Sequence, residues 1–156
     1  NENTFSLKEI QLSLWNLWLE TFDIQVLNEI SERLRLTGKQ IELIQQTKKL
    51  RETLPSLIEL KPSQVTEKLS AFSDIAIRTV LLSEEQNHLT MALTDYLEVY
   101  KQIRVYTTGE DLRKRGFSPS PLFDRILTQL KVAWLDGDIT NYRAEIELLE
   151  KILAEQ

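Results

Sequence analysis

Residues 83–103, SEEQNHLTMALTDYLEVYKQI, decide the fold class. Apolar residues recur there at spacings of three and four, as they do on one face of an α-helix: Leu89, Leu93, Tyr96, Leu97, Tyr100 and Ile103. Ser83 and Gln86 have the spacing of a capping box, which predicts that the helix begins there. One long amphipathic helix is therefore expected over this stretch.

Three further helices are expected on its N-terminal side. The first follows a capping box of Ser6 and Glu9, and its apolar residues predict one buried face: Ile10, Leu14, Leu17 and Trp18. The second ends where Thr37 and Gln40 form another capping box, which opens the third. Pro55 stops the third helix because proline lacks the backbone N–H that a helix interior needs.

Shorter helices are expected around it and beyond it. Pro62 suits a first helical turn, Ser120-Pro121 starts a later helix, and Asn141 can cap the last one. The segment 103–106 comes closest to the alternation of a strand, but it is better placed as the end of the long helix. The sequence therefore predicts an all-α fold of about seven to nine helices without a sheet.

Composition excludes several kinds of chemistry. The 156 residues, 42% of them hydrophobic, can bury a core. The chain has no cysteine and one histidine, His88, so thiolate metal sites, a cysteine nucleophile and multi-histidine sites are all excluded. Its four glycines are scattered, which excludes glycine-rich nucleotide loops. No apolar run approaches the roughly 18 residues of a bilayer span, so a soluble, cytoplasmic protein is expected.

The net charge of −5 conceals two basic segments. Residues 33–51 hold six basic residues against one acidic residue, and residues 101–125 hold six against three. Affinity for a polyanion depends on the cations of the contacting face rather than on total charge. Nucleic acid therefore stays open as a partner, although basic runs on helices are more often solvated surfaces.

Three other features leave alternatives open. Asp136 and Asp138 form a carboxylate pair of the type that binds magnesium, but with Gly137 between them an interhelical turn is favoured. A patch with Trp15 and Trp18 exposed would instead indicate a protein-interaction or oligomerisation module without RNA binding. Tyr106, at the edge of a basic segment, is a candidate for stacking on a base.

Residues 108–121, TGEDLRKRGFSPSP, differ from an ordinary surface segment. Thr108 can cap a short helix over about residues 110–115, and Gly116 supplies the left-handed residue that ends it. Two helix ends then meet at a corner, where backbone N–H groups and cations can face a phosphate strand. Such a corner needs its glycine and prolines, but it does not need four cations: Arg113, Lys114, Arg115 and Arg125.

This segment resembles the C-terminal signature of bacterial tRNA nucleotidyltransferases, the CCA-adding enzymes, and poly(A) polymerases. The pattern TG-x-DL-x-x-x-G is followed by Pro119 and Pro121, then by Ile126-Leu127 and by the turn Leu135-Asp136-Gly137. Ser120 stands where the family has a glycine. The resemblance covers about residues 60–156, including Leu60-Lys61-Pro62-Ser63, and residues 1–55 are compatible with it.

The resemblance implies a helical neck and body segment in residues 1–55 and a body and tail segment in residues 56–156. These segments would grip the elbow of a tRNA by its phosphates, while an N-terminal catalytic head of the same polypeptide adds nucleotides to the 3′ end. The head would use magnesium and ATP or CTP. Its catalytic motif has no counterpart here, so no catalytic residue, metal or cofactor is expected in this chain. The expected RNA-binding residues are Lys101, Arg104, Gly109, Arg113, Lys114, Arg115, Gly116, Ser120 and Arg125.

Overall fold

The computed structural model describes residues 7–85, 87–118 and 120–154. These residues form nine α-helices and two 3₁₀-helices and contain no strand, which confirms the all-α prediction. In chain order the elements are α1 (Leu7–Leu19), α2 (Ile24–Leu34), α3 (Gly38–Thr53), η1 (Leu54–Leu57), α4 (Pro62–Leu69), α5 (Asp74–Ser83), α6 (Asn87–Glu98), η2 (Tyr100–Gln102), α7 (Gly109–Lys114), α8 (Pro121–Leu135) and α9 (Tyr142–Ala154).

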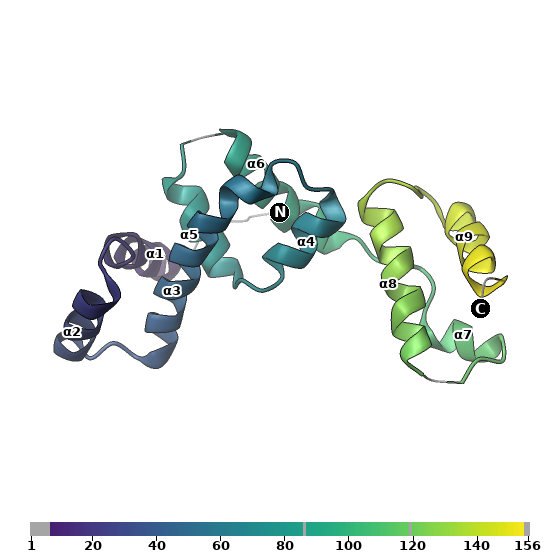
Figure 1. Cartoon of the computed structure of the whole chain (residues 1–156), viewed down its shortest axis with the longest axis horizontal. Helices are drawn as coiled ribbons and strands as arrows, with labels where there is room; N and C mark the ends of the chain where they lie inside the picture. The colour runs from purple at the N-terminus through teal and green to yellow at the C-terminus, as the bar shows by residue number, and fades with distance from the viewer. Residues whose placement is uncertain (1–6, 86, 119, 155–156) are drawn as a thin grey trace.

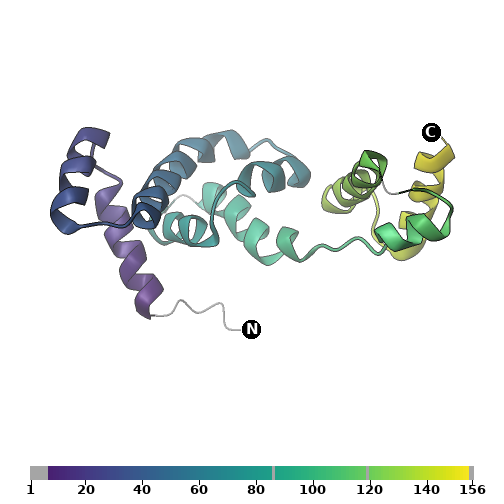
Figure 2. The ribbon, with the colours of Figure 1, turned by 90° about the horizontal axis from the view of Figure 1, so that it is seen from below.

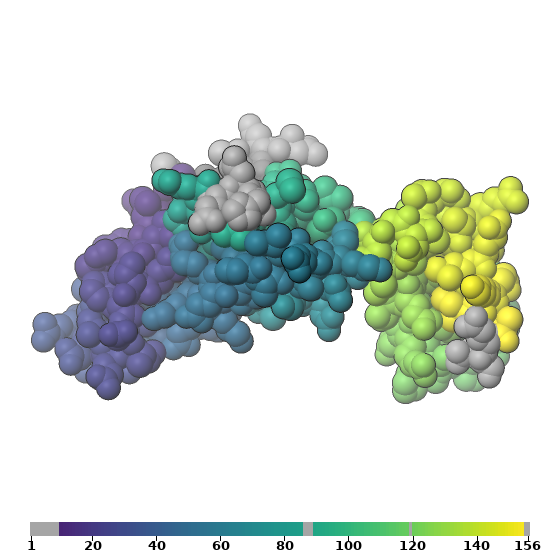
Figure 3. Space-filling model, turned by 45° about the horizontal axis from the view of Figure 1, so that its top comes forward, coloured from purple at the N-terminus to yellow at the C-terminus, as the bar shows by residue number. Residues whose placement is uncertain are grey.

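The helices form two lobes (Figure 1). The N-terminal lobe contains α1 to η2 and is elongated, whereas the C-terminal lobe contains only α7, α8 and α9. Figure 2 shows α1 and α2 at the end remote from the C-terminal lobe. The lobes meet over a narrow waist in Figure 3, and the non-helical segment 103–108 connects them.

Each lobe has its own buried core. The C-terminal core joins residues of α7, α8 and α9: Leu112, Phe123, Ile126, Leu130, Leu149 and Ile152. The largest N-terminal core runs from Leu50 of α3 to Leu97 of α6. Leu54 and Leu57 both belong to it, one on each side of the segment boundary expected after residue 55. The clearest separation of the chain therefore lies at residues 103–108.

Several helix boundaries follow the local sequence signals. The capping box of Thr37 and Gln40 is present, Pro62 is the first residue of α4, and Asn141 accepts a hydrogen bond from the Ala144 N–H at 3.0 Å. The α-helix before Pro55 ends at Thr53, and the chain continues through Pro55 as η1. The box expected at Ser6 lies outside the described residues.

The long helix predicted over residues 83–103 is shorter than expected. Ser83 is the last residue of α5, where its hydroxyl donates to the Val80 carbonyl at 3.2 Å and accepts from Arg51 at 2.7 Å, so it does not cap α6. Gln86 lies outside the described residues. At the other end α6 stops at Glu98, and Ile103 is extended rather than helical. The prediction that 103–106 ends the helix was therefore wrong.

Helix α1 buries the face opposite to the predicted one. Its buried residues include Ser13, Asn16 and Leu19, and Glu20 directly after the helix is buried as well, so three of these four residues are polar. Asn16 donates to Thr47 at 3.0 Å, and Ser13 accepts from Thr79 at 2.9 Å, so hydrogen bonds to α3 and α5 compensate the burial of these two side chains. The apolar residues Ile10, Leu14 and Trp18 are exposed instead, together with Trp15.

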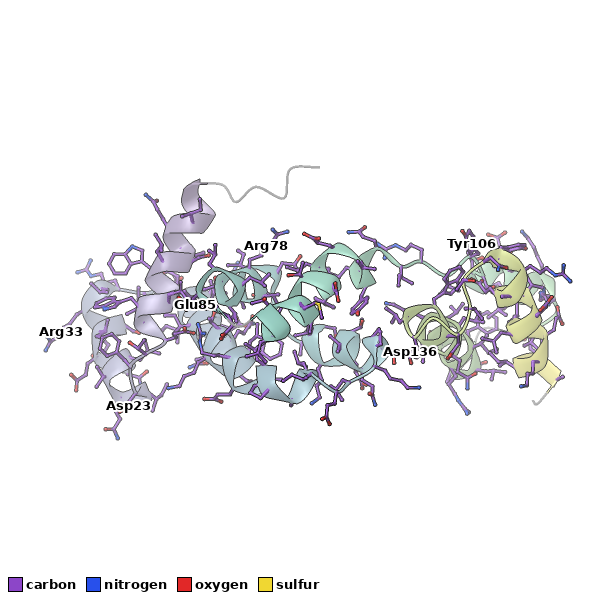
Figure 4. All side chains as sticks on the ribbon, turned by 90° about the horizontal axis from the view of Figure 1, so that it is seen from above. Asp23, Arg33, Arg78, Glu85, Tyr106 and Asp136 are labelled. Atoms are coloured by element: carbon purple, nitrogen blue, oxygen red, sulfur yellow. The ribbon has the colours of Figure 1, made fainter. Side chains whose placement is uncertain are left out.

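Asp136 ties the two lobes together. It lies in the turn after α8, where Gly137 has a φ of +78°. Its two carboxylate oxygens accept hydrogen bonds from the backbone N–H and the hydroxyl of Ser63, at 2.8 and 2.9 Å. Figure 4 shows Asp136 on the side of the C-terminal lobe that faces the N-terminal lobe. Two segments that carry the family resemblance, 60–63 and 135–137, are therefore in direct contact.

Candidate nucleic-acid interface

The signature segment begins with a closed helix end. Thr108 accepts a hydrogen bond from the Asp111 N–H at 3.3 Å, and Asp111 accepts from the Thr108 N–H and hydroxyl at 2.9 and 2.6 Å. The hydrogen bonds from the Thr108 hydroxyl and N–H hold the pKa of Asp111 below its usual range. A carboxylate of the chain itself thus caps the start of α7 and engages the Thr108 N–H.

The end of α7 and the start of α8 follow the prediction more closely. Gly116 has a φ of +91°, a left-handed conformation that glycine adopts without a Cβ clash. Its predicted role as the left-handed residue that follows α7 is therefore confirmed. Ser120 precedes the first residue of α8 with a φ of −160°, which is extended backbone open to any residue. The backbone therefore does not need a glycine at position 120. Pro119 lies outside the described residues.

Four cations surround this corner. Arg113, Lys114 and Arg115 are exposed at the end of α7, and Arg125 is exposed on α8. Lys114 is 69% exposed and lies 3.7 Å from Glu110, a surface pair that binds weakly. Arg115 pairs with Glu150 of α9. The end of α7 and the beginning of α8 thus present several positive groups to solvent.

Three other predicted residues, Lys101, Arg104 and Gly109, have partners within the protein. Lys101 forms an ion pair with Asp74 of α5 at 2.6 Å. Arg104 donates to the carbonyls of Lys101 and Ile103, at 2.7 and 3.3 Å, and so satisfies the end of η2. Gly109 is the first residue of α7, where an added Cβ would lie 3.6 Å from the Phe123 ring. The structure therefore gives these three residues contacts within the protein.

Glu145 of α9 is a residue that the sequence reasoning missed. It has no exposed surface and accepts four hydrogen bonds: from the Tyr106 N–H at 3.0 Å, and from the Thr107 N–H, the Thr107 hydroxyl and the Trp134 indole, each at 2.6 Å. Burial raises the pKa of Glu145, but these hydrogen bonds outweigh burial and leave it lowered. The sequence signal was a carboxylate four residues before Leu149, a spacing that places Glu145 on the same side of α9 as this buried leucine.

Glu145 positions an aromatic cluster beside the cations. Tyr106 packs against Trp134 and Tyr142, with ring centroids 5.8 and 5.6 Å away. Tyr106 and Tyr142 are nevertheless 60% and 58% exposed. Both line a pocket of about 230 Å³ whose other walls are Thr107, Asp111, Lys114, Arg115, Ile146 and Leu149. Figure 4 shows Tyr106 at the edge of the C-terminal lobe.

The paired carboxylates Asp136 and Asp138 form the predicted turn. Both oxygens of Asp136 are engaged by Ser63, and Asp138 is exposed. Within residues 7–85, 87–118 and 120–154, no three His, Cys, Asp or Glu side chains are grouped as a metal ion would require. His88 belongs to α6, but its side chain lies outside the described part.

Comparisons with protein-family models, with curated proteins and with solved structures give no match for this chain. Among the helices that the described residues form, none has both the length and the apolar character needed to cross a membrane. The physical basis for a function is therefore the arrangement of cations and aromatic rings around α7.

Proposed function

We propose that this chain is the helical body and tail of a tRNA nucleotidyltransferase or poly(A) polymerase, and that it binds tRNA through phosphate contacts. The observation that carries the proposal is the set of exposed cations at the α7–α8 corner: Arg113, Lys114, Arg115 and Arg125. The corner is built by the capping box of Thr108 and by the left-handed Gly116, and neither needs these charges. Arg115 is paired with Glu150 of α9 and Lys114 weakly with Glu110, but these are surface ion pairs, which a polyanion can replace.

Phosphate contacts of this kind position an RNA without reading its sequence. In the proposed role the chain holds the tRNA by its elbow, and an N-terminal catalytic head of the same polypeptide adds nucleotides to the 3′ end. Magnesium and ATP or CTP would belong to that head, and the chain described here would supply no catalytic group. The activity would take place in the cytoplasm.

The elongated shape suits this division of labour. Helix α1 lies towards one end of the molecule, and α7 and α8 lie at the other (Figure 2). The apolar residues Leu14, Trp15 and Trp18 of α1 are exposed. A head packed on the α1 face would cover Trp15 and Trp18 and leave the corner free. The hydrogen bonds between Ser63 and Asp136 would then hold the RNA-binding lobe at a fixed distance from the head.

Fluorescence anisotropy with labelled tRNA tests the proposal. We expect the wild-type chain to bind tRNA, and the triple variant Arg113→Ala, Lys114→Ala, Arg115→Ala to bind at least about tenfold more weakly at low salt. The matched control removes the same charge from exposed residues of the other lobe: Arg33→Ala, Lys39→Ala, Lys49→Ala. Equal loss of affinity in both triple variants would show that the corner has no special role.

A second candidate function is self-association without RNA binding. Trp15 and Trp18 are 53% and 52% exposed, and Trp15 also borders an apolar pocket lined by Leu12, Leu19, Leu34, Leu36 and Ile44. A face of this kind can join two copies of the chain. Light scattering and tRNA binding together distinguish the two candidates. The second is favoured if the wild-type chain is a dimer without affinity for tRNA and if Trp15→Lys and Trp18→Lys dissociate that dimer.

A further inference from the structure

We propose that Tyr106 and Tyr142 form a stacking site for one unpaired base of the bound RNA, with Lys114 contacting a neighbouring phosphate. The inference rests on the proposed function and adds a ligand class to it: a nucleotide in a single-stranded loop. Paired bases inside a duplex keep both faces covered by their neighbours, whereas a loop base can turn a face towards a protein ring.

Tyr106 and Tyr142 are both largely exposed. A tyrosine that serves only the core buries its ring, yet more than half of each of these side chains is open to solvent. Their centroids are 5.6 Å apart at an interplanar angle of 78°, so the two rings present surfaces in different directions. A base that enters the pocket between the helices can therefore contact one ring by its face and the other by its edge.

Hydrogen bonds hold the backbone of Tyr106 in place. The backbone N–H groups of Tyr106 and Thr107 both donate to the buried carboxylate of Glu145, at 3.0 and 2.6 Å. The Trp134 indole donates to the same carboxylate, and its ring packs against the Tyr106 ring at 5.8 Å. The tyrosine ring is thus oriented before any RNA binds, which reduces the entropy lost on binding.

The opposite wall of the pocket carries positively charged side chains. Lys114 and Arg115 both line it, and the guanidinium of Arg115 is already paired with Glu150. Among the described residues, Lys114 pairs with the exposed Glu110 at 3.7 Å, a weak surface contact, so its ammonium can turn to a phosphate. The carboxylate of Asp111, which also lines the pocket, is engaged by Thr108.

A pocket with an aromatic wall and a cationic wall fits a nucleotide better than a simpler ligand. A free phosphate would use the cation alone, and an apolar molecule would use the rings alone. A nucleotide uses both, because the base stacks on an aromatic ring while the phosphate pairs with the ammonium. Tyr106 belongs to the non-helical segment 103–108 and Tyr142 to α9, so the site exists only when the C-terminal lobe is folded.

Leucine and phenylalanine variants of the full chain test the stacking site. Tyr142→Leu and Tyr106→Leu keep an apolar side chain but remove the ring, so each should weaken tRNA binding about tenfold without changing its salt dependence. Tyr142→Phe and Tyr106→Phe keep the ring and should retain the wild-type affinity. The hydrogen bonds of the Glu145 carboxylate come from Tyr106, Thr107 and Trp134. Tyr142→Leu therefore leaves these donors in place and remains informative if Tyr106→Leu disturbs the fold, which circular dichroism would reveal.

The outcomes separate this inference from the function on which it rests. If the leucine variants bind tRNA as tightly as the wild type while the Arg113, Lys114, Arg115 triple variant binds weakly, stacking is overturned and phosphate binding stands. Equal losses in the phenylalanine and leucine variants would also overturn stacking, since the hydroxyl would then be the contact. A wild-type chain without affinity for tRNA overturns both.

Discussion

Glu145 accepts four hydrogen bonds with no exposed surface, so its substitution leaves buried donors without partners. We expect Glu145→Gln to lower the free energy of unfolding by about 2–4 kcal/mol near neutral pH, because the amide nitrogen would face N–H donors. The control is Glu147→Gln, an exposed residue of the same helix paired with Arg143, which should change stability by less than about 0.5 kcal/mol. Urea unfolding measures both, and equal effects would contradict this account of Glu145.

The same carboxylate predicts a pH dependence. Its folded-state pKa lies below the ordinary value of 4.5, so its contribution to stability is complete above that value and is lost as the pH falls through the lower, folded-state pKa. The wild type should therefore lose stability more steeply than Glu145→Gln on acidification below about pH 4.5. Parallel pH profiles of the melting temperature in the two proteins would refute the assignment.

Gly137 tests a backbone requirement at a single residue. Its φ of +78° places it in the left-handed region, and no atom lies within 4 Å of an added Cβ. Gly137→Ala should therefore cost about 1–2 kcal/mol through conformation alone. Gly38, the first residue of α3, has equal space but no left-handed backbone, so Gly38→Ala should be neutral or stabilising by up to about 1 kcal/mol. Thermal unfolding distinguishes the two, and a stabilising Gly137→Ala would contradict the prediction.

At the scale of the element, α1 reverses the orientation that its apolar periodicity predicts. We expect Leu19→Ala to lower the free energy of unfolding by about 2–4 kcal/mol, because Leu19 is buried against Leu27 and Ile44. Leu14→Ala, on the exposed face of the same helix, should cost less than about 0.5 kcal/mol. Urea titrations of both variants check the orientation, and a larger loss for Leu14→Ala would show that the other face is buried.

The elements also show where sequence reasoning succeeds. The caps at Thr37, Thr108 and Asn141 were predictable because each acts on residues three positions away. The role of Ser83 was not, because its hydroxyl bonds Arg51, which is 32 residues earlier. The predicted orientation of α1 was wrong for the same reason, because its buried polar side chains bond partners in α3 and α5 that are distant in the sequence.

The candidate site also contains some features that the sequence could predict and others that it could not. The exposed cations of α7 and the left-handed Gly116 could be predicted because they depend on local charge and backbone geometry. The pairing of Lys101 with Asp74 joins residues 27 positions apart, and Glu145 binds a segment nearly forty residues earlier in the chain. Contacts of this range require the folded structure.

At the scale of the whole molecule, the hydrogen bonds between Ser63 and Asp136 join the two lobes. Asp136→Ala removes both bonds, and we expect the distribution of distances within the molecule to broaden as the lobes move about residues 103–108. Small-angle X-ray scattering measures that distribution. Asp138→Ala is the matched control, because it removes an exposed carboxylate of the same turn. An unchanged scattering curve for Asp136→Ala would show that other contacts orient the lobes.

The most direct test of the central claim is the salt dependence of tRNA binding, which counts the phosphates that the protein neutralises. We predict that the logarithm of the association constant falls linearly with the logarithm of the salt concentration for the wild type. The slope should become shallower by about two to three for the variant that lacks Arg113, Lys114 and Arg115. The same slope in both proteins, or a wild-type affinity that salt does not change, would contradict phosphate binding at the α7–α8 corner.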